Sequence, residues 1–354
     1  MFYACQRHSS EFLNKMSKQN EFHVVTPLLE STGMSKRMGS TVYLKMENSQ
    51  PTGSFKIRGI GHMCQNVRRN TFCLVLQIRK SREVLFVLQV VMLGWPQHMR
   101  RESSTCQPPL FYLQQLLSLL LRNLWTKEQQ SKLRARHEHS IITLAWDEAN
   151  AEALRLAEIE GLTVIHPFNH PLVWKGHSTI VHELKASLPS KPGAIVLSVG
   201  GGGLFCGVME GLDEVGWGDV PVLCMECVGA DCLNVALKAR NLVTLADITS
   251  EATCLGAKTA CPQAFEFAKR PNVISEVVSD QQALEAMEHF LDEERVLVEL
   301  ACGASLAAVY SGVIQRLQDE GRLPKPLEPL VMIVCGGGSV NLAQLQHLQR
   351  VIRK

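Results

Sequence analysis

The chain has little net charge and lacks the long apolar runs of a membrane protein. Its 36 Lys and Arg residues nearly balance its 34 Asp and Glu residues, so the formal net charge of +2 gives no sign of a nucleic-acid or anionic-membrane partner. No uncharged run reaches the length of a membrane span, and residues 1–20 lack the apolar core of a secretory signal. We therefore expect no nucleic-acid partner, no membrane partner and a cytoplasmic protein.

The twelve cysteines lack the regular spacing of a secreted disulfide scaffold, which predicts free thiols in a reducing compartment. Cys224 and Cys227 match a C-x-x-C pattern, but no second pair lies at zinc spacing, so we predict no zinc site there. The hydrophobic fraction of 46% and charged fraction of 20% are typical of a globular chain. The length of 354 residues leaves room for two domains.

Residues 71–145 contain no Asp, and Gly94 is their only glycine. A parallel α/β segment should show apolar runs that glycine turns separate, and this segment is instead rich in Leu, Gln, Arg and Ser. The segment is therefore anomalous. Two interpretations follow from the residues alone: a basic helix over residues 122–136 that binds an acidic partner, or an amphipathic interaction segment over residues 110–121.

Lys56 stands at the start of a predicted helix. The alternating residues 41–47 predict a strand, and Pro51 and Gly53 then turn the backbone before the lysine. Its apolar neighbours Phe55 and Ile57 would partly desolvate Lys56 and lower its pKa, which favours the neutral amine that nucleophilic chemistry on a carbonyl requires. The alternative is an ordinary surface lysine beside a turn.

Two glycine runs follow short apolar runs. The apolar residues 194–199 lead into Gly200–Gly203 and then a helical stretch, an arrangement that points main-chain N–H groups and a helix N-terminus at a phosphate. The alternative is a tight packing turn between strand and helix. Residues 330–334 lead into Cys335 and three glycines. Helical stretches alternate with strands predicted at residues 163–168, 194–199, 220–225 and 330–334. This alternation predicts an α/β fold with a mostly parallel sheet covered by helices on both faces.

Together these stretches resemble the L-serine dehydratase/L-threonine deaminase family of fold-type II pyridoxal-phosphate enzymes, closest to its serine dehydratase-like members. The resemblance covers residues 21–70 and 146–350, and it is carried by residues 23–28, 50–59, 200–203, 298–304 and 335–337. It implies a two-domain, fold-type II architecture. The large cofactor-binding domain would comprise residues 1–49 and 168–354, and the small substrate domain residues 50–167.

The resemblance also implies roles for single residues. Lys56 would bind pyridoxal 5'-phosphate covalently and later remove the α-proton of the substrate. Phe55 and Cys254 would cover the two faces of the cofactor ring, and Cys335 would meet the ring nitrogen beside Gly336. The cofactor phosphate would be held by Gly200, Gly201, Gly202, Gly203 and Leu204. A monovalent cation such as K⁺ would be bound by Gly200, Glu226, Ala230, Leu255 and Ala257.

The implied activity is that of a lyase in amino-acid degradation, a homodimer that eliminates water and ammonia from its substrate. L-Serine would give pyruvate and ammonia, and L-threonine would give 2-oxobutyrate. The family has a Ser-x-Gly-Asn-Ala-Gly substrate loop where this chain has Leu76–Lys80, and that loop is absent. A reading frame shifted between two intact flanks is therefore a third interpretation of residues 71–145. The missing loop predicts very poor turnover. The alternatives are a non-catalytic relative that acts through association and a defective chain.

Other features of the sequence are expected to be structural. His166, His170 and His177 lie beside Pro167, Phe168 and Trp174, and this context favours packing over acid–base catalysis. Leu300 replaces a proline of the family motif, which we expect to be a minor local change.

Overall fold

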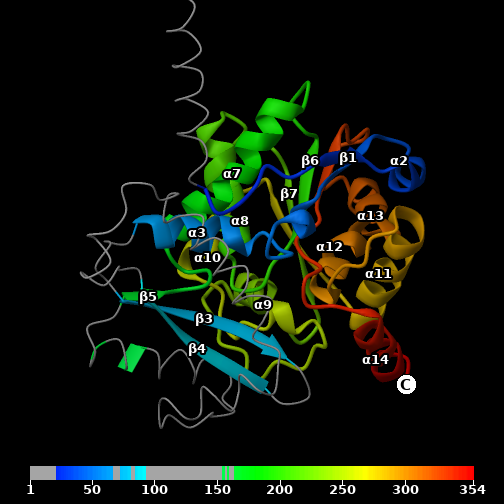
Figure 1. Cartoon of the computed structure of the whole chain (residues 1–354). Helices are drawn as coiled ribbons and strands as arrows, with labels where there is room; N and C mark the ends of the chain where they lie inside the picture. The colour runs from blue at the N-terminus through cyan, green and yellow to red at the C-terminus, as the bar shows by residue number, and fades with distance from the viewer. Residues whose placement is uncertain (1–20, 67–71, 81–83, 93–153, 156–157, 159–162) are drawn as a thin grey trace, which may run out of the picture. The chain divides into compact units, whose positions relative to one another are not determined.

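The computed structural model describes residues 21–66, 72–80, 84–92, 154–155, 158 and 163–354 (Figure 1). The chain divides into two compact units, one of residues 1–24 and 95–139 and the other of residues 25–94 and 140–354. Only residues 21–24 of the first unit are described, so the following account concerns the second. The segments of the two interaction hypotheses, residues 110–121 and 122–136, lie outside the described residues.

A six-stranded sheet organises the second unit. Its strands, in spatial order, are β1 (Leu28–Glu30), β2 (Val42–Lys45), β9 (Leu330–Ile333), β6 (Ala194–Ser198), β7 (Val222–Cys227) and β8 (Val273–Val278). Strand β1 is antiparallel to β2, and all other neighbours are parallel. Every residue of β6, β7 and β9 is buried, as expected for parallel strands covered on both faces. The predicted mostly parallel α/β sheet is confirmed.

Helices cover both faces of this sheet. Figure 1 shows α3 (Lys56–Asn66), α7 (Pro171–Ser187) and α8 (Gly203–Glu214) on one side, and α11 (Asp280–Glu294), α12 (Leu300–Tyr310) and α13 (Val313–Asp319) on the other. The remaining helices are α2 (Thr32–Met38), α9 (Cys232–Ala239), α10 (Pro262–Ala268) and α14 (Leu342–Ile352), with short 3₁₀ helices η2 (Glu47–Ser49) and η4 (Thr253–Leu255).

A second, three-stranded sheet has the order β4 (Val84–Met92), β3 (Phe72–Lys80), β5 (Thr163–Ile165). Strand β3 pairs antiparallel with β4 along its whole length and parallel with β5 through residues 73–75. Part of the anomalous segment 71–145 therefore forms a β-hairpin. Strand β5 ends earlier than the predicted residues 163–168.

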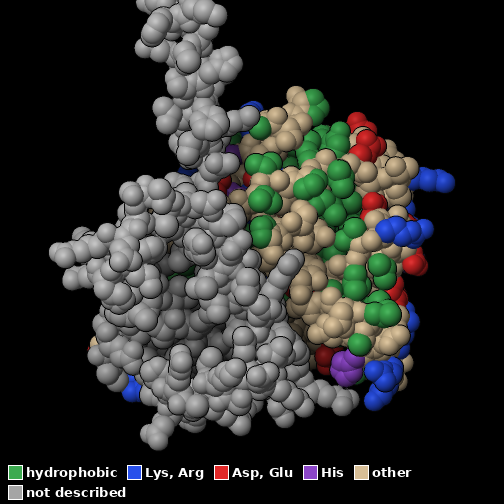
Figure 2. Space-filling model, viewed as in Figure 1, with side chains coloured by type: hydrophobic (Ala, Val, Ile, Leu, Met, Phe, Trp, Pro, Cys, Tyr) green, Lys and Arg blue, Asp and Glu red, His purple; other side chains and the backbone are tan. Residues whose placement is uncertain are grey.

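Figure 2 shows hydrophobic side chains over the middle of the described surface on this side of the molecule, and Lys, Arg, Asp and Glu side chains mainly along its right-hand edge. Among the described residues, no single helix is long and apolar enough to cross a membrane. Helices α12 and α13 reach the length and apolar composition of a membrane span only when they are taken together, and they are bent by 43° relative to each other.

Candidate active site

The turn before Lys56 is joined backbone to backbone with the loop that follows β9. The Phe55 N–H donates a 3.1 Å hydrogen bond to the Cys335 carbonyl oxygen, and Ser54 forms a β-bridge with Gly336. Gly53 has a φ of +75°, and a Cβ atom there would lie 2.7 Å from the Gly338 Cα atom. Glycine is therefore required at this position both by conformation and by space. The two loops singled out in the sequence thus form one unit.

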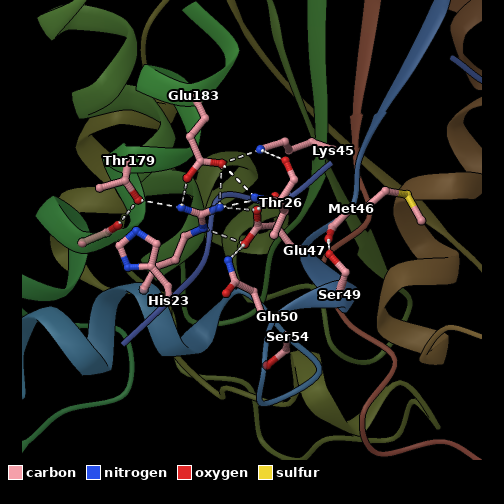
Figure 3. Close-up of polar contacts among 12 residues, drawn as sticks. His23, Thr26, Lys45, Met46, Glu47, Ser49, Gln50, Ser54, Thr179 and Glu183 are labelled. Carbon is pink, nitrogen blue, oxygen red and sulfur yellow. Dashed lines mark hydrogen bonds and ion pairs between the residues drawn. The ribbon is translucent and has the colours of Figure 1, made fainter. Parts of the chain in front are cut away.

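Helix α3, which begins at Lys56, is anchored by the buried guanidinium of Arg58. Glu47 accepts two hydrogen bonds of 2.7 Å from the Arg58 Nε and Nη2 atoms, and Glu183 on α7 accepts bonds of 2.6 and 2.9 Å (Figure 3). Lys45 on β2 donates to the same Glu183 carboxylate. Arg58 and Glu47 are fully buried. This ion cluster fixes the first turn of α3, and so the lysine, relative to the sheet and α7. The sequence analysis did not identify the cluster, because its members come from separate segments.

Lys56 is half-buried, and its Nζ atom lies 5.0 Å from the centroid of the Phe55 ring. Burial lowers the pKa of the Lys56 ammonium, but electrostatic interactions with Cys254, Glu299 and Cys335 raise it, and the net shift is upward. The predicted lowering of this pKa is therefore wrong. Desolvation acts as expected, but acidic groups from three distant segments outweigh it.

The glycine loop after β6 leads directly into α8. Gly202 caps the helix with a φ of +94°, a conformation that favours glycine. A Cβ atom at Gly201 would overlap the Phe168 ring, and one at Gly203 would lie 2.8 Å from the Phe168 Cα atom. Within the described part of the chain, the N–H groups of Gly201, Gly202 and Gly203 donate no hydrogen bond. The loop is thus a tight packing turn that also presents unused donors.

Cys335 lies at the carboxyl end of β9, beside the carboxyl end of β6. Its Sγ atom is 3.4 Å from the Ser198 Oγ atom, and its thiol also hydrogen-bonds Cys302. This bond to Cys302, together with burial, raises the pKa of Cys335 well above its usual value. Cys335 is therefore a neutral thiol at physiological pH.

Cys254 lies on η4, with its Sγ atom 4.0 Å from the Ser339 Oγ atom. The thiol reaches solvent, yet enough protein surrounds it that desolvation, followed by the charge of Glu299, raises its pKa to about 12. Leu204, the second residue of α8, is buried. Cys254 and Cys335 both interact electrostatically with Lys56, and the roles that the resemblance gave the two thiols at the cofactor ring stay predictions.

One carboxylate that contributes to the raised pKa of Lys56 was absent from the predicted site. Glu299 is buried at the start of α12, and its Oε1 atom accepts a 3.1 Å hydrogen bond from the Ser339 N–H. Its own N–H donates 3.0 Å to the Gly336 carbonyl oxygen. The only sequence signal for Glu299 was its position in the family-like stretch 298–304.

The residues predicted to hold a cation include the fully buried carboxylate of Glu226. Its two carboxylate oxygens accept hydrogen bonds of 2.9 and 2.8 Å from the N–H groups of Leu233 and Asn234 at the start of α9. Burial raises the pKa of Glu226 to about 8 despite these donors. Gly200 packs against Leu255, since a Cβ there would lie 3.1 Å from the Leu255 carbonyl oxygen. Among the described residues, no group of three or more His, Cys, Asp or Glu side chains is arranged to hold a metal.

Each of the three histidines has a structural role. The His166 Nδ1 atom accepts the Asn169 N–H at 2.8 Å, and burial lowers the pKa of His166 to about 4. The His170 side chain accepts the Leu172 N–H and caps α7, whose first residue is Pro171. This cap fixes the start of α7 at Pro171. His177 is fully buried against Gly59 and Gly207.

No loop occupies the position at which the family carries its substrate loop. Leu76–Lys80 continue strand β3, and they pair antiparallel with residues 84–88 of β4. Their main-chain groups are therefore engaged in a sheet rather than arranged in a turn after a strand. The sequence-based prediction that the asparagine loop is missing agrees with this hairpin.

The comparisons with known proteins agree with this arrangement. The profile of a family described as "Pyridoxal-phosphate dependent enzyme" matches residues 20–85 and 125–336, so the unmatched stretch is narrower than the predicted break at residues 71–145. Human "Serine dehydratase-like" is 46% identical, over 94% of this chain and 96% of its own length. Human "L-serine dehydratase/L-threonine deaminase" is 45% identical, over 94% of this chain and 97% of its own length. A crystal structure of a fungal L-serine ammonia-lyase from Rhizomucor miehei matches with a TM-score of 0.71 and 29% identity, over 94% of this chain and 99% of that one. These similarities confirm the predicted fold-type II architecture.

Proposed function

Because this chain belongs to the family of pyridoxal-phosphate dependent enzymes, we propose that Lys56 binds pyridoxal phosphate covalently and that the chain acts on L-serine and L-threonine. The observation that carries the proposal is the joined pair of loops, in which the turn before Lys56 is hydrogen-bonded to the loop of Cys335. This pairing joins the turn before Lys56 to the loop at the carboxyl end of β9, and ligands bind at this edge of the sheet in open α/β folds.

The donor set fits the phosphate of the cofactor. The unused N–H groups of Gly201–Gly203 and the N-terminus of α8 offer several donors and a positive helix end to one anion. No acidic residue occupies the first turn of α8, so nothing there opposes a phosphate. Leu204 follows Gly203 in this turn, and Phe168 packs against Gly201 and Gly203.

The bound cofactor supplies an electron sink for the carbanion that forms at the substrate α-carbon. The chain's own contribution is the Lys56 Nζ atom, which accepts the α-proton as general base. Phe55 and Cys254 would pack on the two faces of the ring. The neutral thiol of Cys335, beside Gly336, cannot keep the ring nitrogen protonated as a carboxylate would. A weaker sink favours loss of the β-hydroxyl over transamination.

The proposed reaction converts L-serine to pyruvate and ammonia, or L-threonine to 2-oxobutyrate and ammonia, with low turnover. The β3–β4 hairpin stands where the family binds the substrate carboxylate, so the chain lacks that clamp. Orientation is a large part of the catalytic advantage in such reactions. The alternative is a relative that binds pyridoxal phosphate without catalysis and acts through association, and the same hairpin favours it.

A monovalent cation such as K⁺ would be held by Glu226 and by carbonyl oxygens of Gly200, Ala230, Leu255 and Ala257, since hard cations prefer oxygen ligands. The packing of Gly200 against Leu255 supports this set. Both Glu226 oxygens already accept main-chain N–H groups, so any cation would share the carboxylate with α9.

We propose two domains that correspond to the two sheets. All six strands of the large sheet lie within residues 1–49 and 168–354, and all three strands of the small sheet lie within residues 50–167. We further propose a cytoplasmic homodimer. Nine free thiols among the described residues support a reducing compartment, and light scattering of the purified chain tests the dimer.

Titration with pyridoxal phosphate tests the proposal. The chain should develop the visible absorption band of lysine-bound cofactor, and Lys56→Ala should abolish it. Lys191→Ala, at an exposed ion pair with Asp219, is the matched control and should leave the band unchanged. Pyruvate release from L-serine then separates catalysis from binding alone. Absence of the band in the unmodified chain would refute cofactor binding, and rapid pyruvate release would refute the loss of the substrate clamp.

A further inference from the structure

Two buried thiols that the proposed reaction does not use face each other beside the glycine loop. Cys206 lies in the first turn of α8, and Cys261 directly precedes α10, which packs on α8. Their Sγ atoms are 3.6 Å apart, and the two residues are 0% and 2% exposed. A disulfide bond of about 2 Å therefore requires the sulfurs to come only about 1.5 Å closer.

Both cysteines are attached to the glycine loop through their main chains. The Cys206 N–H donates a 2.8 Å hydrogen bond to the Gly202 carbonyl oxygen. The Cys261 N–H donates a 3.0 Å bond to the Gly201 carbonyl oxygen. The loop also packs directly on this segment, since a Cβ atom at Gly202 would lie 2.4 Å from the Ala264 Cβ atom and 3.4 Å from the Cys261 Sγ atom. A movement that draws the two sulfurs together therefore also moves the loop.

The two thiols differ in acidity. The hydrogen bond with Cys206, supported by main-chain N–H groups at the start of α10, lowers the pKa of Cys261, whereas burial raises the pKa of Cys206. Cys261 is therefore the thiol that loses its proton more readily, and the thiolate is the form that attacks an oxidant. Because both thiols are buried, the oxidant must be small, and hydrogen peroxide meets this condition.

We propose that Cys206 and Cys261 are a site of reversible oxidation, at which hydrogen peroxide forms a disulfide that weakens the hold of the glycine loop on a phosphate group. The effect on the phosphate rests on the proposed function, whereas the disulfide concerns the two thiols alone. Disulfides of this transient, redox-sensing kind occur in reducing compartments.

The oxidation proceeds in two steps. The Cys261 thiolate attacks the peroxide, so that an S–O bond forms and the O–O bond breaks, and the departing hydroxide takes up the proton that Cys261 released. The Cys206 sulfur then attacks the sulfenic sulfur of Cys261, and an S–S bond replaces the S–O bond. The second hydroxide leaves with the Cys206 proton. Two thiols thus lose two electrons, and hydrogen peroxide is reduced to two water molecules.

Peptide mapping without reduction tests the disulfide. The purified chain is treated with hydrogen peroxide, its remaining thiols are alkylated, and fragmentation of linked peptides identifies the joined cysteines. We expect a link between Cys206 and Cys261 that dithiothreitol removes. Cys302 and Cys335, which also share a hydrogen bond, are a competing pair. A link between those two alone, or no link at all, would overturn the inference.

Titration with pyridoxal phosphate tests the effect on the glycine loop. The oxidised chain should bind the cofactor about tenfold more weakly than the reduced chain, a usual size for coupling between two sites. Reduction, followed by removal of the reductant, should restore the affinity. Equal affinities of the chain with the Cys206–Cys261 link and the reduced chain would overturn the inference.

Cysteine variants separate this pair from other oxidised thiols. Cys206→Ala, or Cys261→Ala if the first variant does not fold, should bind the cofactor equally before and after peroxide. Cys224→Ala, at a buried thiol on β7, is the matched control and should keep the loss of affinity. A loss of the same size in Cys206→Ala would assign the effect to another thiol and overturn the inference.

The proposed function and this inference fail separately. A reduced chain that never forms the visible band with pyridoxal phosphate refutes the proposed function, and the mapping of the disulfide then decides the inference by itself. A reduced chain that forms the band, but forms no link between Cys206 and Cys261 in peroxide, keeps the proposed function and loses this inference.

Discussion

The main-chain N–H of Phe55 donates a 3.1 Å hydrogen bond to the carbonyl oxygen of Cys335. This bond, with the Ser54–Gly336 bridge beside it, joins two loops that are distant in sequence. The lysine that follows Phe55 is held to one loop, and the thiol of Cys335 belongs to the other. Cofactor binding should therefore depend on how closely the two backbones approach.

Gly53→Ala tests that approach. The substitution adds a Cβ atom 2.7 Å from the Gly338 Cα atom, at a position with a φ of +75°. Separation of the loops should weaken binding of pyridoxal phosphate about tenfold or more, since backbone strain and steric overlap at such positions each cost about 1 kcal/mol or more. Spectroscopic titration gives the affinity. Gly39→Ala, also at positive φ but with open space around it, is the matched control and should retain the affinity.

Gly201→Ala should reduce affinity for the cofactor by pushing the glycine loop away from the Phe168 ring. The double variant Gly201→Ala with Phe168→Leu removes most of the overlap and should recover part of the loss. The difference between single and double variants measures the coupling. If the double variant binds no better than Gly201→Ala alone, contact with Phe168 is not what requires glycine there.

Arg58→Met should destabilise the fold by about 3–5 kcal/mol, because it leaves the fully buried carboxylate of Glu47 without its cation. Lys191→Met, at the exposed pair with Asp219, should cost less than about 1 kcal/mol. Urea unfolding measures both. A loss at Arg58 as small as that at Lys191 would contradict the anchoring role of the cluster.

The stability of the chain should fall as pH rises from 4.5 toward 8 through the buried carboxyl of Glu226. Burial raises the pKa of Glu226 from 4.5 to about 8, so between these values the folded chain holds a proton that the unfolded chain has released. The free energy of unfolding then decreases with pH, by at most about 1.4 kcal/mol per unit from this group. Glu226→Gln should flatten the unfolding profile in that range.

Thermal unfolding near pH 8 also tests the proposed cation. A bound K⁺ would stabilise the ionised carboxylate of Glu226, so potassium chloride should raise the melting temperature near pH 8 more than tetramethylammonium chloride at equal ionic strength. Glu226→Gln should remove this difference. Equal melting temperatures in the two salts would argue against a cation at this carboxylate.

Much of the fold was predictable, because its signals are local. The apolar runs at residues 194–199 and 330–334 read as buried parallel strands, and the turn at Gly53 placed Lys56 at a helix start. The electrostatics of the site were not predictable. The pKa of Lys56 depends on Glu299 and Cys254, which only the tertiary fold brings near it, so the flanking residues alone gave the wrong direction. The cap of α7 was not identified from the sequence either, since the capping role of His170 is unusual.

Peptide mapping after borohydride reduction tests the central claim most directly. The purified chain is incubated with pyridoxal phosphate, reduced and digested, and the modified peptide is identified by mass spectrometry. We predict a phosphopyridoxyl group on Lys56, and no such group on that peptide when inorganic phosphate in large excess competes for the glycine loop. Modification spread over exposed lysines such as Lys175 and Lys191, with none at Lys56, would contradict the account.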